Sequence, residues 1–220
     1  MALVTTVQPA QEPVSSTDLA SFLRIDPSDT DSVNNAVSLA LGARVLIEGY
    51  LRRRLITQTL QYSLDHFPWG DVNSASMVAG YPMITAGASL YDVNSTLSIW
   101  LPGGNVQSIS SFTFLTAGVS ATPVSLVPGP GNDYIQDVAS VPARLTPPWG
   151  KPWPPMGSYN TNSVQITYVV GYGDTGADVP GNILSAIKML TAMYYENRLP
   201  LDADIPMQVK ALLHRDKIIY

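Results

Sequence analysis

The chain has 220 residues, of which 45% are hydrophobic, a formal net charge of −5 and no cysteine. This length suffices for one large or two small domains with a substantial buried core. The composition excludes disulfides and thiolate metal sites, and no apolar run reaches the roughly 18 residues of a membrane span. The N-terminal residues lack the positive charge and apolar stretch of a signal peptide, so we expect synthesis in the cytoplasm.

The negative charge is concentrated in the middle of the chain. Residues 55–178 carry two basic side chains, Arg144 and Lys151, against seven aspartates. A surface that grips the phosphates of a nucleic acid requires clusters of Lys and Arg. The middle segment is therefore not built to bind DNA tightly, although DNA could pass beside it.

Two helices are predicted in the first 54 residues. Ser15 and Asp18 have the spacing of a weak capping box and begin a short helix. A longer helix is expected from Thr30 to Arg54, with acidic residues at its start and arginines at its end, as the helix dipole favours. Apolar residues expected on the inner face of the short helix are Leu19, Phe22 and Leu23. The stripe of the long helix comprises Val33, Ala36, Ala40, Ala43, Ile47 and Tyr50, widened by Val37, Leu41 and Leu51.

Two further features of the long helix concern its surface. Glu48 lies four residues after Arg44 and four before Arg52, which predicts surface ion pairs. Leu39 and Val45 fall outside the main apolar stripe. Such a surplus of apolar residues suits packing against a neighbouring subunit, and a thick core explains it equally well.

The middle of the chain alternates with a period of two, which is typical of strands. Strands are expected around Leu60–Leu64 and at five later segments, which are Thr96–Trp100, Val106–Leu115, Pro123–Val127, Tyr134–Val138 and Val164–Val170. Turns rich in Gly and Pro separate them, which favours an antiparallel sandwich or small barrel. Residues 68–92 are rich in Ser, Ala and Gly and predict a long loop.

The segment from Val164 to Arg198 combines a strand, a glycine turn and a helix. Val164, Ile166 and Tyr168 alternate with polar residues, and Gly171-Tyr172-Gly173 then allows the chain to turn. Pro180 suits the first turn of a helix that we expect to reach Arg198. A last short helix is predicted over residues 206–214.

Together these patterns predict an α+β fold. We expect the N- and C-terminal helices to form a helical bundle from residues 1–56 and 179–220. An antiparallel β-sandwich-like lobe, residues 57–178, would be inserted between them.

Candidate catalytic and metal-binding residues are few. His66 and His214 lie in no nucleophile or metal motif, so a hydrolase that uses His66 is a remote alternative. The run from Asp174 to Asp178 resembles a calcium loop only vaguely, because it lacks the further acidic positions and the closing Glu of an EF-hand. No phosphate loop is present, because no glycine pair precedes Lys-Ser or Lys-Thr. We predict no catalytic residue, no cofactor and no metal site.

Two tryptophans leave a second function open. Trp149 and Trp153 lie among prolines, where they could form a stacking platform for a ligand or a hydrophobic plug over the sandwich. The platform interpretation would make the β lobe a non-catalytic binding module for a carbohydrate or a protein.

Four blocks of sequence, in this order, resemble a known family. They are Pro13–Asp26, Ala43–Thr59, Leu101–Ile109 and Tyr168–Arg198, the last containing Tyr168-Val169-Val170-Gly171-Tyr172-Gly173 and Tyr195-Glu196-Asn197-Arg198. The chain resembles the head–tail connector proteins, also called adaptor or head-completion proteins, of long-tailed bacteriophages and gene transfer agents. Where that family often has prolines after the Leu-Pro pair, this chain has Gly103-Gly104-Asn105.

The resemblance implies a structural virion protein without catalysis. Such proteins form an oligomeric ring, usually a dodecamer, beneath the portal protein in the neck of the virion. The ring extends the DNA channel, through which double-stranded DNA passes without specific binding. It also offers a docking surface to the next neck protein, a stopper or tail terminator.

Residues for these roles are proposed from the charge and position of each side chain. Basic residues at the end of the long helix, and basic and apolar residues in the C-terminal tail, would contact the portal or another partner: Arg52, Arg53, Arg54, Lys210, His214, Arg215, Lys217, Ile218, Ile219 and Tyr220. We expect the tail from Lys210 to be disordered until it meets a partner. A second set would hold the fold: Arg44, Glu48, Pro180, Tyr195, Glu196 and Arg198. For the last three, the candidate contact is to Arg44 or Glu48.

Overall fold

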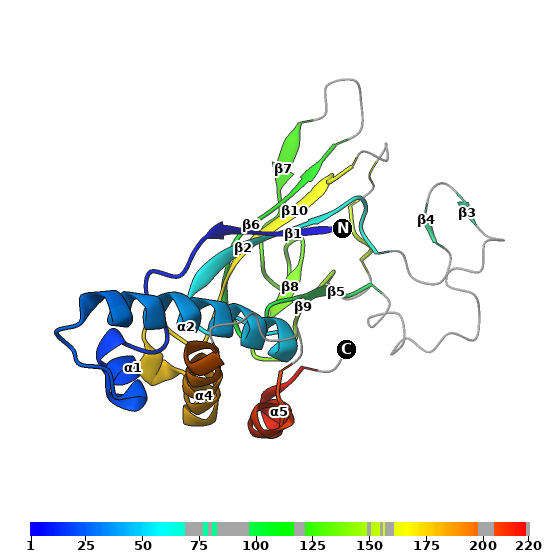
Figure 1. The fold of residues 1–220 in the computed structure, drawn as a ribbon. Coiled ribbons are helices and arrows are strands. Elements are labelled where there is room, and N and C mark those ends of the chain that lie inside the picture. The colour runs from blue at the N-terminus through cyan, green and yellow to red at the C-terminus, as the bar shows by residue number, and fades with distance from the viewer. Residues whose placement is uncertain are drawn as a thin grey trace. The chain divides into compact units, whose positions relative to one another are not determined.

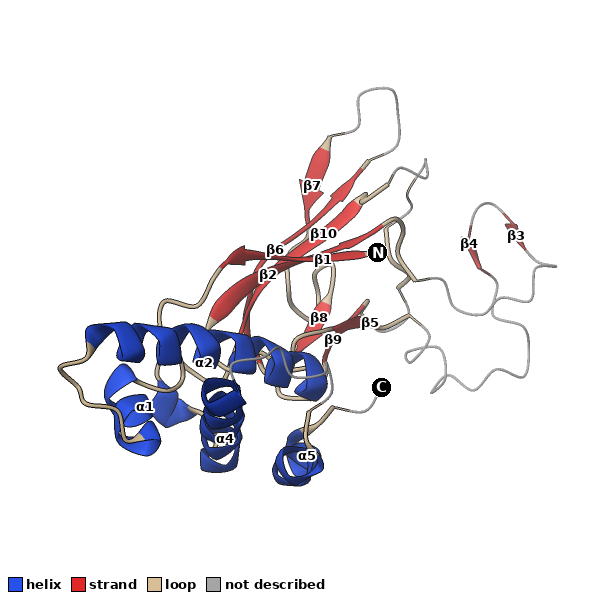
Figure 2. Ribbon diagram, viewed as in Figure 1, coloured by secondary structure: helices blue, strands red, loops and turns tan. Residues whose placement is uncertain are grey.

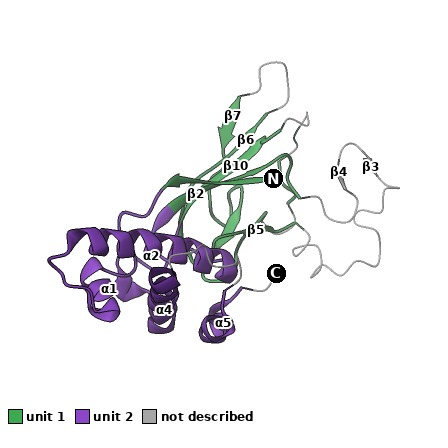
Figure 3. Ribbon diagram, viewed as in Figure 1, with its two compact units in different colours: residues 1–7, 59–169 green, residues 8–58, 170–220 purple. Residues whose placement is uncertain are grey.

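The computed structural model describes residues 1–68, 77–78, 81–82, 97–116, 122–148, 151–154, 156, 161–197 and 205–218. The chain divides into two compact units, each made of two separate segments (Figure 3). The sheet unit contains Met1–Val7 and Thr59–Val169, and the helical unit contains Gln8–Gln58 and Val170–Tyr220. Helices and antiparallel strand pairs are both present, which confirms the α+β class (Figure 2).

The helical unit contains all four α-helices of the described residues (Figure 1). They are α1 (Ser16–Leu23), α2 (Thr30–Leu51), α4 (Gly181–Asn197) and α5 (Met207–Leu213), with 3₁₀ turns η1 (Gly176–Asp178) and η2 (His214–Asp216). Side chains cap the first two helices: Ser15, as predicted, accepts a hydrogen bond from the Asp18 N–H, and Asp29 accepts one from the Ser32 N–H. None of the described helices has the length and hydropathy needed to cross a membrane.

Helix α2 ends at Leu51, earlier than the predicted Arg54. Arg52 adopts a left-handed conformation (φ 57°), and its N–H bonds the Glu48 carbonyl. A left-handed residue of this kind closes the last turn of a helix and redirects the chain. The arginines that follow therefore leave the helix axis instead of extending it.

The core of the helical unit lies between α2, α4 and α5. Helix α4 packs against both α2 and α5. The buried contributors from these three helices are Ala40, Ala43, Ile47, Leu51, Ile183, Ala186, Ile187, Leu190, Val209 and Leu213. Small alanines at the centre of the α2 stripe allow a close approach of the helix axes.

Two residues that we expected on inner faces are exposed instead. Phe22 of α1 and Leu41 of α2 each retain 48% of their accessible surface. Leu41 follows the buried Ala40 by about 100° around the helix, which takes it off the packed stripe. The prediction was wrong for these two side chains because the packed stripe is narrower than the apolar sequence pattern.

The sheet unit is built on five strands in the order β1-β2-β10-β6-β7. Their bounds are β1 (Ala2–Val7), β2 (Gln58–Leu64), β10 (Val164–Val170), β6 (Val106–Leu115) and β7 (Pro123–Ser125). In the central strand β10, Val164, Ile166 and Tyr168 are fully buried, which confirms the predicted alternation. Strand β1 pairs antiparallel with β2, from Ala2 opposite Ser63 to Val7 opposite Thr59. This pairing places the first residues with the sheet, whereas we expected them with the helices.

A second, three-stranded antiparallel sheet has the order β5-β9-β8. It comprises β5 (Ile99–Leu101), β9 (Ala143–Thr146) and β8 (Ile135–Asp137). The sequence pattern missed β9, a short strand directly after a proline. The predicted loop at 68–92 lies outside the described residues, apart from Pro68 and the paired strands β3 (Met77–Val78) and β4 (Tyr81–Pro82).

An aromatic cluster fills the interior of the sheet unit. The Trp153 and Phe67 rings stack with centroids 5.1 Å apart, and Phe112 and Phe114 also contact this pair. Trp153 is only 6% exposed, and its indole N–H donates to the Leu97 carbonyl at 2.7 Å. Trp153 is therefore part of a hydrophobic plug, and its interpretation as a ligand platform was wrong. Trp149 lies outside the described residues.

The glycine turn after β10 is explained by a backbone crossing within the helical unit. The Tyr172 N–H donates to the Leu55 carbonyl at 3.0 Å, and the Thr57 N–H donates to the Gly173 carbonyl at 2.9 Å. Gly171 has φ +133°, and a Cβ there would lie 2.7 Å from the Ile56 carbonyl carbon and the Thr57 nitrogen. Only glycine permits both this dihedral angle and this approach.

We expect Gly171→Ala to lower the free energy of unfolding by at least about 2 kcal/mol, because it adds backbone strain and a clash with residues 56 and 57. Chemical denaturation would measure the change. Gly42→Ala is the matched control: a Cβ at Gly42, in α2, meets no atom within 4 Å, so this variant should gain up to about 1 kcal/mol. Equal effects at the two glycines would contradict the crossing.

Candidate functional site: the end of helix α2 and the C-terminal tail

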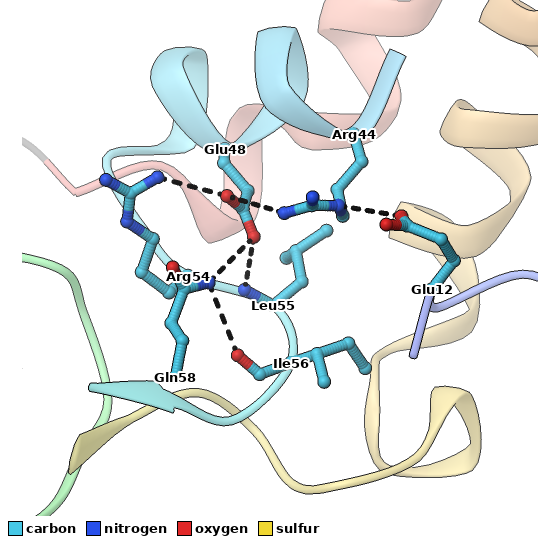
Figure 4. Close-up of polar contacts among 7 residues, drawn as sticks. All are labelled: Glu12, Arg44, Glu48, Arg54, Leu55, Ile56 and Gln58. Atoms are coloured by element: carbon cyan, nitrogen blue, oxygen red, sulfur yellow. Dashed lines mark hydrogen bonds and ion pairs between the residues drawn. The ribbon is translucent and has the colours of Figure 1, made fainter. Parts of the chain in front are cut away.

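A buried carboxylate, that of Glu48, organises the end of α2 (Figure 4). Its Oε2 accepts hydrogen bonds from Arg44 Nη1 at 3.3 Å and Arg54 Nη1 at 3.1 Å. Its Oε1 accepts one from the Leu55 N–H at 3.0 Å and one from Gln58 Nε2 at 3.5 Å. The side chain is 1% exposed, so this ion-pair network is buried, not at the surface as we expected.

The network compensates each buried charge with an opposite one. Arg44 is also buried, and its Nε donates to Glu12 Oε2 at 2.7 Å. Two guanidinium groups and two carboxylates are thus joined in one chain of contacts (Figure 4). Pairing of this kind is required because an isolated charge inside a protein costs several kcal/mol. The network therefore holds together the segment that contains Glu12, helix α2 and the segment after α2.

The sequence patterns missed two members of this network, Glu12 and Gln58. Glu12 had one distinguishing signal, since it is the only charged residue in the first 17. Gln58 had no distinguishing signal, because a polar side chain is expected at alternate positions of a strand. Both contacts join residues well apart in sequence, which periodicity does not report.

The remaining residues predicted to hold the fold occupy different surroundings. The Pro180 carbonyl accepts hydrogen bonds from the Ile183 and Leu184 N–H groups, so Pro180 directly precedes α4. Tyr195 is half-buried and Glu196 is exposed, and within the described ranges neither bonds Arg44 or Glu48. The proposed contact to the long helix was therefore wrong for these two residues, because residues 12, 54, 55 and 58 occupy the network. Arg198 lies outside the described residues.

The structure brings together the two groups of predicted partner-contact residues. The Ile218 N–H donates to the Leu51 carbonyl at 3.1 Å, and Lys217 Nζ lies 4.3 Å from the centre of the Tyr50 ring. The tail therefore runs beside the end of α2, where Arg52 is exposed. Exposed basic or titratable residues near this point in the tail are His214, Arg215 and Lys217, whereas Arg53, Arg54 and Lys210 are half-buried.

The C-terminal tail is folded, which corrects the expectation that it is disordered from Lys210 onward. Val209 and Leu213 of α5 are fully buried in the helical core. The Asn182 side chain donates to the Leu212 carbonyl at 3.0 Å and to the Asp216 carboxylate at 2.6 Å. Ile218 is 5% exposed, so it packs inward instead of presenting an apolar surface. Ile219 and Tyr220 lie outside the described residues.

The aspartate-rich run after the glycine turn forms a closed turn. Asp178 accepts hydrogen bonds from the Thr175 N–H at 3.0 Å and from the Thr175 hydroxyl at 2.9 Å. These bonds, the backbone one first, lower the pKa of the Asp178 carboxyl below its usual 3.8. The Asp178 carboxylate thus stabilises the turn. No group of three or more His, Asp or Glu within the described part of the chain could hold a metal ion.

The two histidines are both exposed. His66 Nδ1 lies 2.9 Å from the Phe67 carbonyl oxygen, next along the chain. The adjacent Asp65 carboxylate accepts a hydrogen bond from the Asn162 N–H at 3.0 Å. This bond, together with the nearby N-terminal ammonium, lowers the pKa of Asp65. These contacts hold the chain in place just after the end of β2.

Comparisons with solved structures find the same fold over the whole chain. A chain in the neck of an empty gene transfer agent particle, computed with C6 symmetry, matches with a TM-score of 0.69 at 19% identity, covering 100% of this chain and 97% of that chain. A chain from the virion of a native gene transfer agent particle matches with a TM-score of 0.64 at 21% identity, covering 100% and 97%.

A third match, from the neck of a native particle computed with C12 symmetry, has a TM-score of 0.59 at 22% identity and covers 98% of this chain and 96% of that chain. No family model and no curated protein matches the chain. The chain thus shares the fold of components of gene transfer agent necks and virions, which confirms the resemblance at the level of the fold.

We expect Glu48→Gln to lower the free energy of unfolding by about 3–5 kcal/mol, because it leaves the buried Arg44 and the half-buried Arg54 without their shared carboxylate. Urea denaturation would measure this loss. Glu196→Gln, at an exposed site on α4, is the control and should change stability by less than about 0.5 kcal/mol. A Glu48→Gln protein as stable as the control would contradict the role of the network.

Asp178→Asn should lower the unfolding midpoint at pH 7, with a difference from the unchanged chain that disappears in acid. The folded-state pKa of Asp178 lies below the unfolded value of 3.8, so its stabilisation is fully present above that value. It is lost as the pH falls through the lowered folded-state pKa. Thermal unfolding at several pH values would test this, with the exposed Asp174→Asn as the control. A difference that persists at the lowest pH would contradict the assignment.

Proposed function

We propose that this chain is a non-enzymatic structural protein of the neck of a tailed-phage-like particle, a virion or gene transfer agent. The observation that carries the proposal is the full-length match in fold, at 96–97% coverage of the other chains, to components of gene transfer agent necks and virions. A match over both units, and not over one common module, favours a shared architectural role.

In this proposal the protein is a head–tail adaptor. Copies of the chain, twelve in number, form a ring beneath the portal protein and extend the channel through which double-stranded DNA passes. The C6 and C12 symmetries of the matched necks favour a ring. The helical unit serves as the frame, and the ring offers a docking surface to the next neck protein, a stopper or tail terminator. The chain is made in the bacterial host cytoplasm and ends in the particle neck.

The end of α2 and the C-terminal tail form the proposed portal-contact surface. Arg52, Arg215 and Lys217 are exposed there and carry positive charge, in a chain whose net charge is −5. A local basic surface on an acidic protein favours an acidic partner, because opposite charges guide association and set its orientation. The buried Glu48 network would keep this surface in a fixed shape, since it holds the residues on either side of Arg52.

The test is to mix the purified protein with the portal oligomer of the same particle and to examine the mixture by negative-stain electron microscopy. We expect a second ring stacked on the narrow end of the portal. Two folded proteins that remain separate at high concentration would overturn the adaptor assignment.

Charge reversal then tests the contact surface. The double variant Arg52→Glu, Arg215→Glu should lose portal attachment while it stays folded by circular dichroism, because both side chains are exposed. Lys151→Glu, an exposed site in the sheet unit, is the control. Attachment of both variants at the level of the unchanged chain would refute this surface without refuting the adaptor role.

A further inference from the structure

Strand β1 forms one edge of the five-stranded sheet. The order of this sheet is β1-β2-β10-β6-β7, so within the described residues β1 pairs only with β2, and its outer side faces no other strand. An edge strand presents a row of backbone N–H and C=O groups with which another strand can pair. These groups select one kind of occupant, an extended polypeptide segment.

The other sheet edges of the described residues are protected against such pairing. Proteins protect an edge by keeping it short or by placing proline, charge or a bulge there. Strand β7 has three residues and begins with Pro123, which has no N–H to donate. Strands β5 and β8, the edges of the second sheet, also have three residues each, and β8 ends in Asp137.

Strand β1 lacks most of these protections. Its six residues, Ala2–Val7, include no proline and no charged side chain. A bulge lies between Thr5 and Val7, but Ala2–Thr5 pair with β2 in an unbroken register. The outer edge of β1 is therefore the longest unprotected edge in the described part of the chain.

The side chains of β1 are exposed on both faces of the sheet. Leu3 retains 40% of its accessible surface and Val4 retains 55%. Successive side chains of a strand point to opposite faces, so these two residues lie on different faces. An added strand would satisfy the backbone edge and would also cover apolar surface on each face through cross-strand pairs.

A second copy of β1 is the occupant that fits this edge. Within the described ranges, β1 is the only edge strand with more than three residues. Because β1 has no charged side chain, two copies can meet there although each chain has a net charge of −5. Two antiparallel copies of one strand are related by a two-fold axis, so each copy contributes the same surface to the contact.

The hydrogen-bond pattern limits the register of such a pair. Two residues that face each other in an antiparallel pair direct their N–H and C=O groups both toward the opposite strand or both away from it. This direction alternates along a strand, so a residue of β1 can face itself or a residue two positions away, but not its neighbour. A register centred on Val4 places Val4 opposite Val4 and Leu3 opposite Thr5, within the unbroken part of the strand.

We propose that the free chain forms a two-fold dimer in which the β1 edges of two copies pair antiparallel about Val4. This pairing joins two five-stranded sheets into one and removes the unprotected edge. The dimer does not depend on the adaptor proposal. A closed cyclic ring contains only heterologous contacts, so the β1 pair belongs to the chain before assembly and has to open when a ring forms.

The absence of cysteine from the chain allows a direct test by cross-linking. Facing residues of an antiparallel pair have Cα atoms about 4.5–5.5 Å apart, which a disulfide can span. Oxidised Val4→Cys should therefore run as a covalent dimer in non-reducing electrophoresis. Val124→Cys, exposed on the protected edge β7, is the matched control and should remain largely unlinked.

Charge substitutions at the same position provide a second test. Val4→Lys and Val4→Glu should each weaken the dimer by about tenfold or more in sedimentation velocity, because like charges then face each other across the axis. An equimolar mixture of the two variants should dimerise again, since opposite charges then face each other. Both variants should stay folded by circular dichroism because Val4 is exposed, and Val124→Lys should dimerise like the unchanged chain.

Three results would overturn the inference. They are an unchanged chain that sediments as a monomer at every concentration, equal cross-linking of Val4→Cys and Val124→Cys, and a mixture of the Lys and Glu variants that stays monomeric. None of these results bears on the adaptor proposal, which the portal experiment decides by the presence or absence of a stacked ring.

Discussion

The helical unit depends on the pairing of one buried carboxylate. Glu48 lies on the inner side of α2, where it holds Arg44 within the helix and Arg54, Leu55 and Gln58 beyond it. Charges in an interior are tolerated only when they are fully compensated, so the position of each partner is strongly constrained. Arg52, with its left-handed backbone, lies between the residues that Glu48 holds. These contacts therefore fix the direction in which the chain leaves α2.

Elements whose signal is local could be predicted from the sequence. The alternation of Val164, Ile166 and Tyr168 predicted β10 with its correct buried face, and Ser15 predicted the start of α1. Caps and periodicity involve residues within a turn or two of one another, so a single sequence contains the whole signal. The resemblance to connector proteins likewise rested on short blocks in a fixed order, and the fold comparisons agree with it.

Contacts between distant segments could not be predicted in this way. The pairing of Glu12 with Arg44, and the crossing of Gly171 over Ile56, join residues that no periodic pattern relates. The same limit explains why Arg44 and Glu48 were placed at the surface: spacing shows that two charges can pair, and only the packing around them shows whether water is present. The pattern also predicted Leu41 on the inner face, because apolar residues are usually buried, but Leu41 is 48% exposed.

The division of each unit into two segments has a consequence for synthesis. The helical unit is completed only by residues from Val170 onward, after the entire sheet segment has left the ribosome. Until then α4 does not cover the apolar stripe of α2. Strand β1 likewise stays unpaired until β2 has been synthesised. Long-range closure of this kind slows folding and exposes hydrophobic surface during translation. Because α5 follows all the other described α-helices and strands, a truncated product that ends before it would lack Val209 and Leu213 and would expose the core that these residues cover.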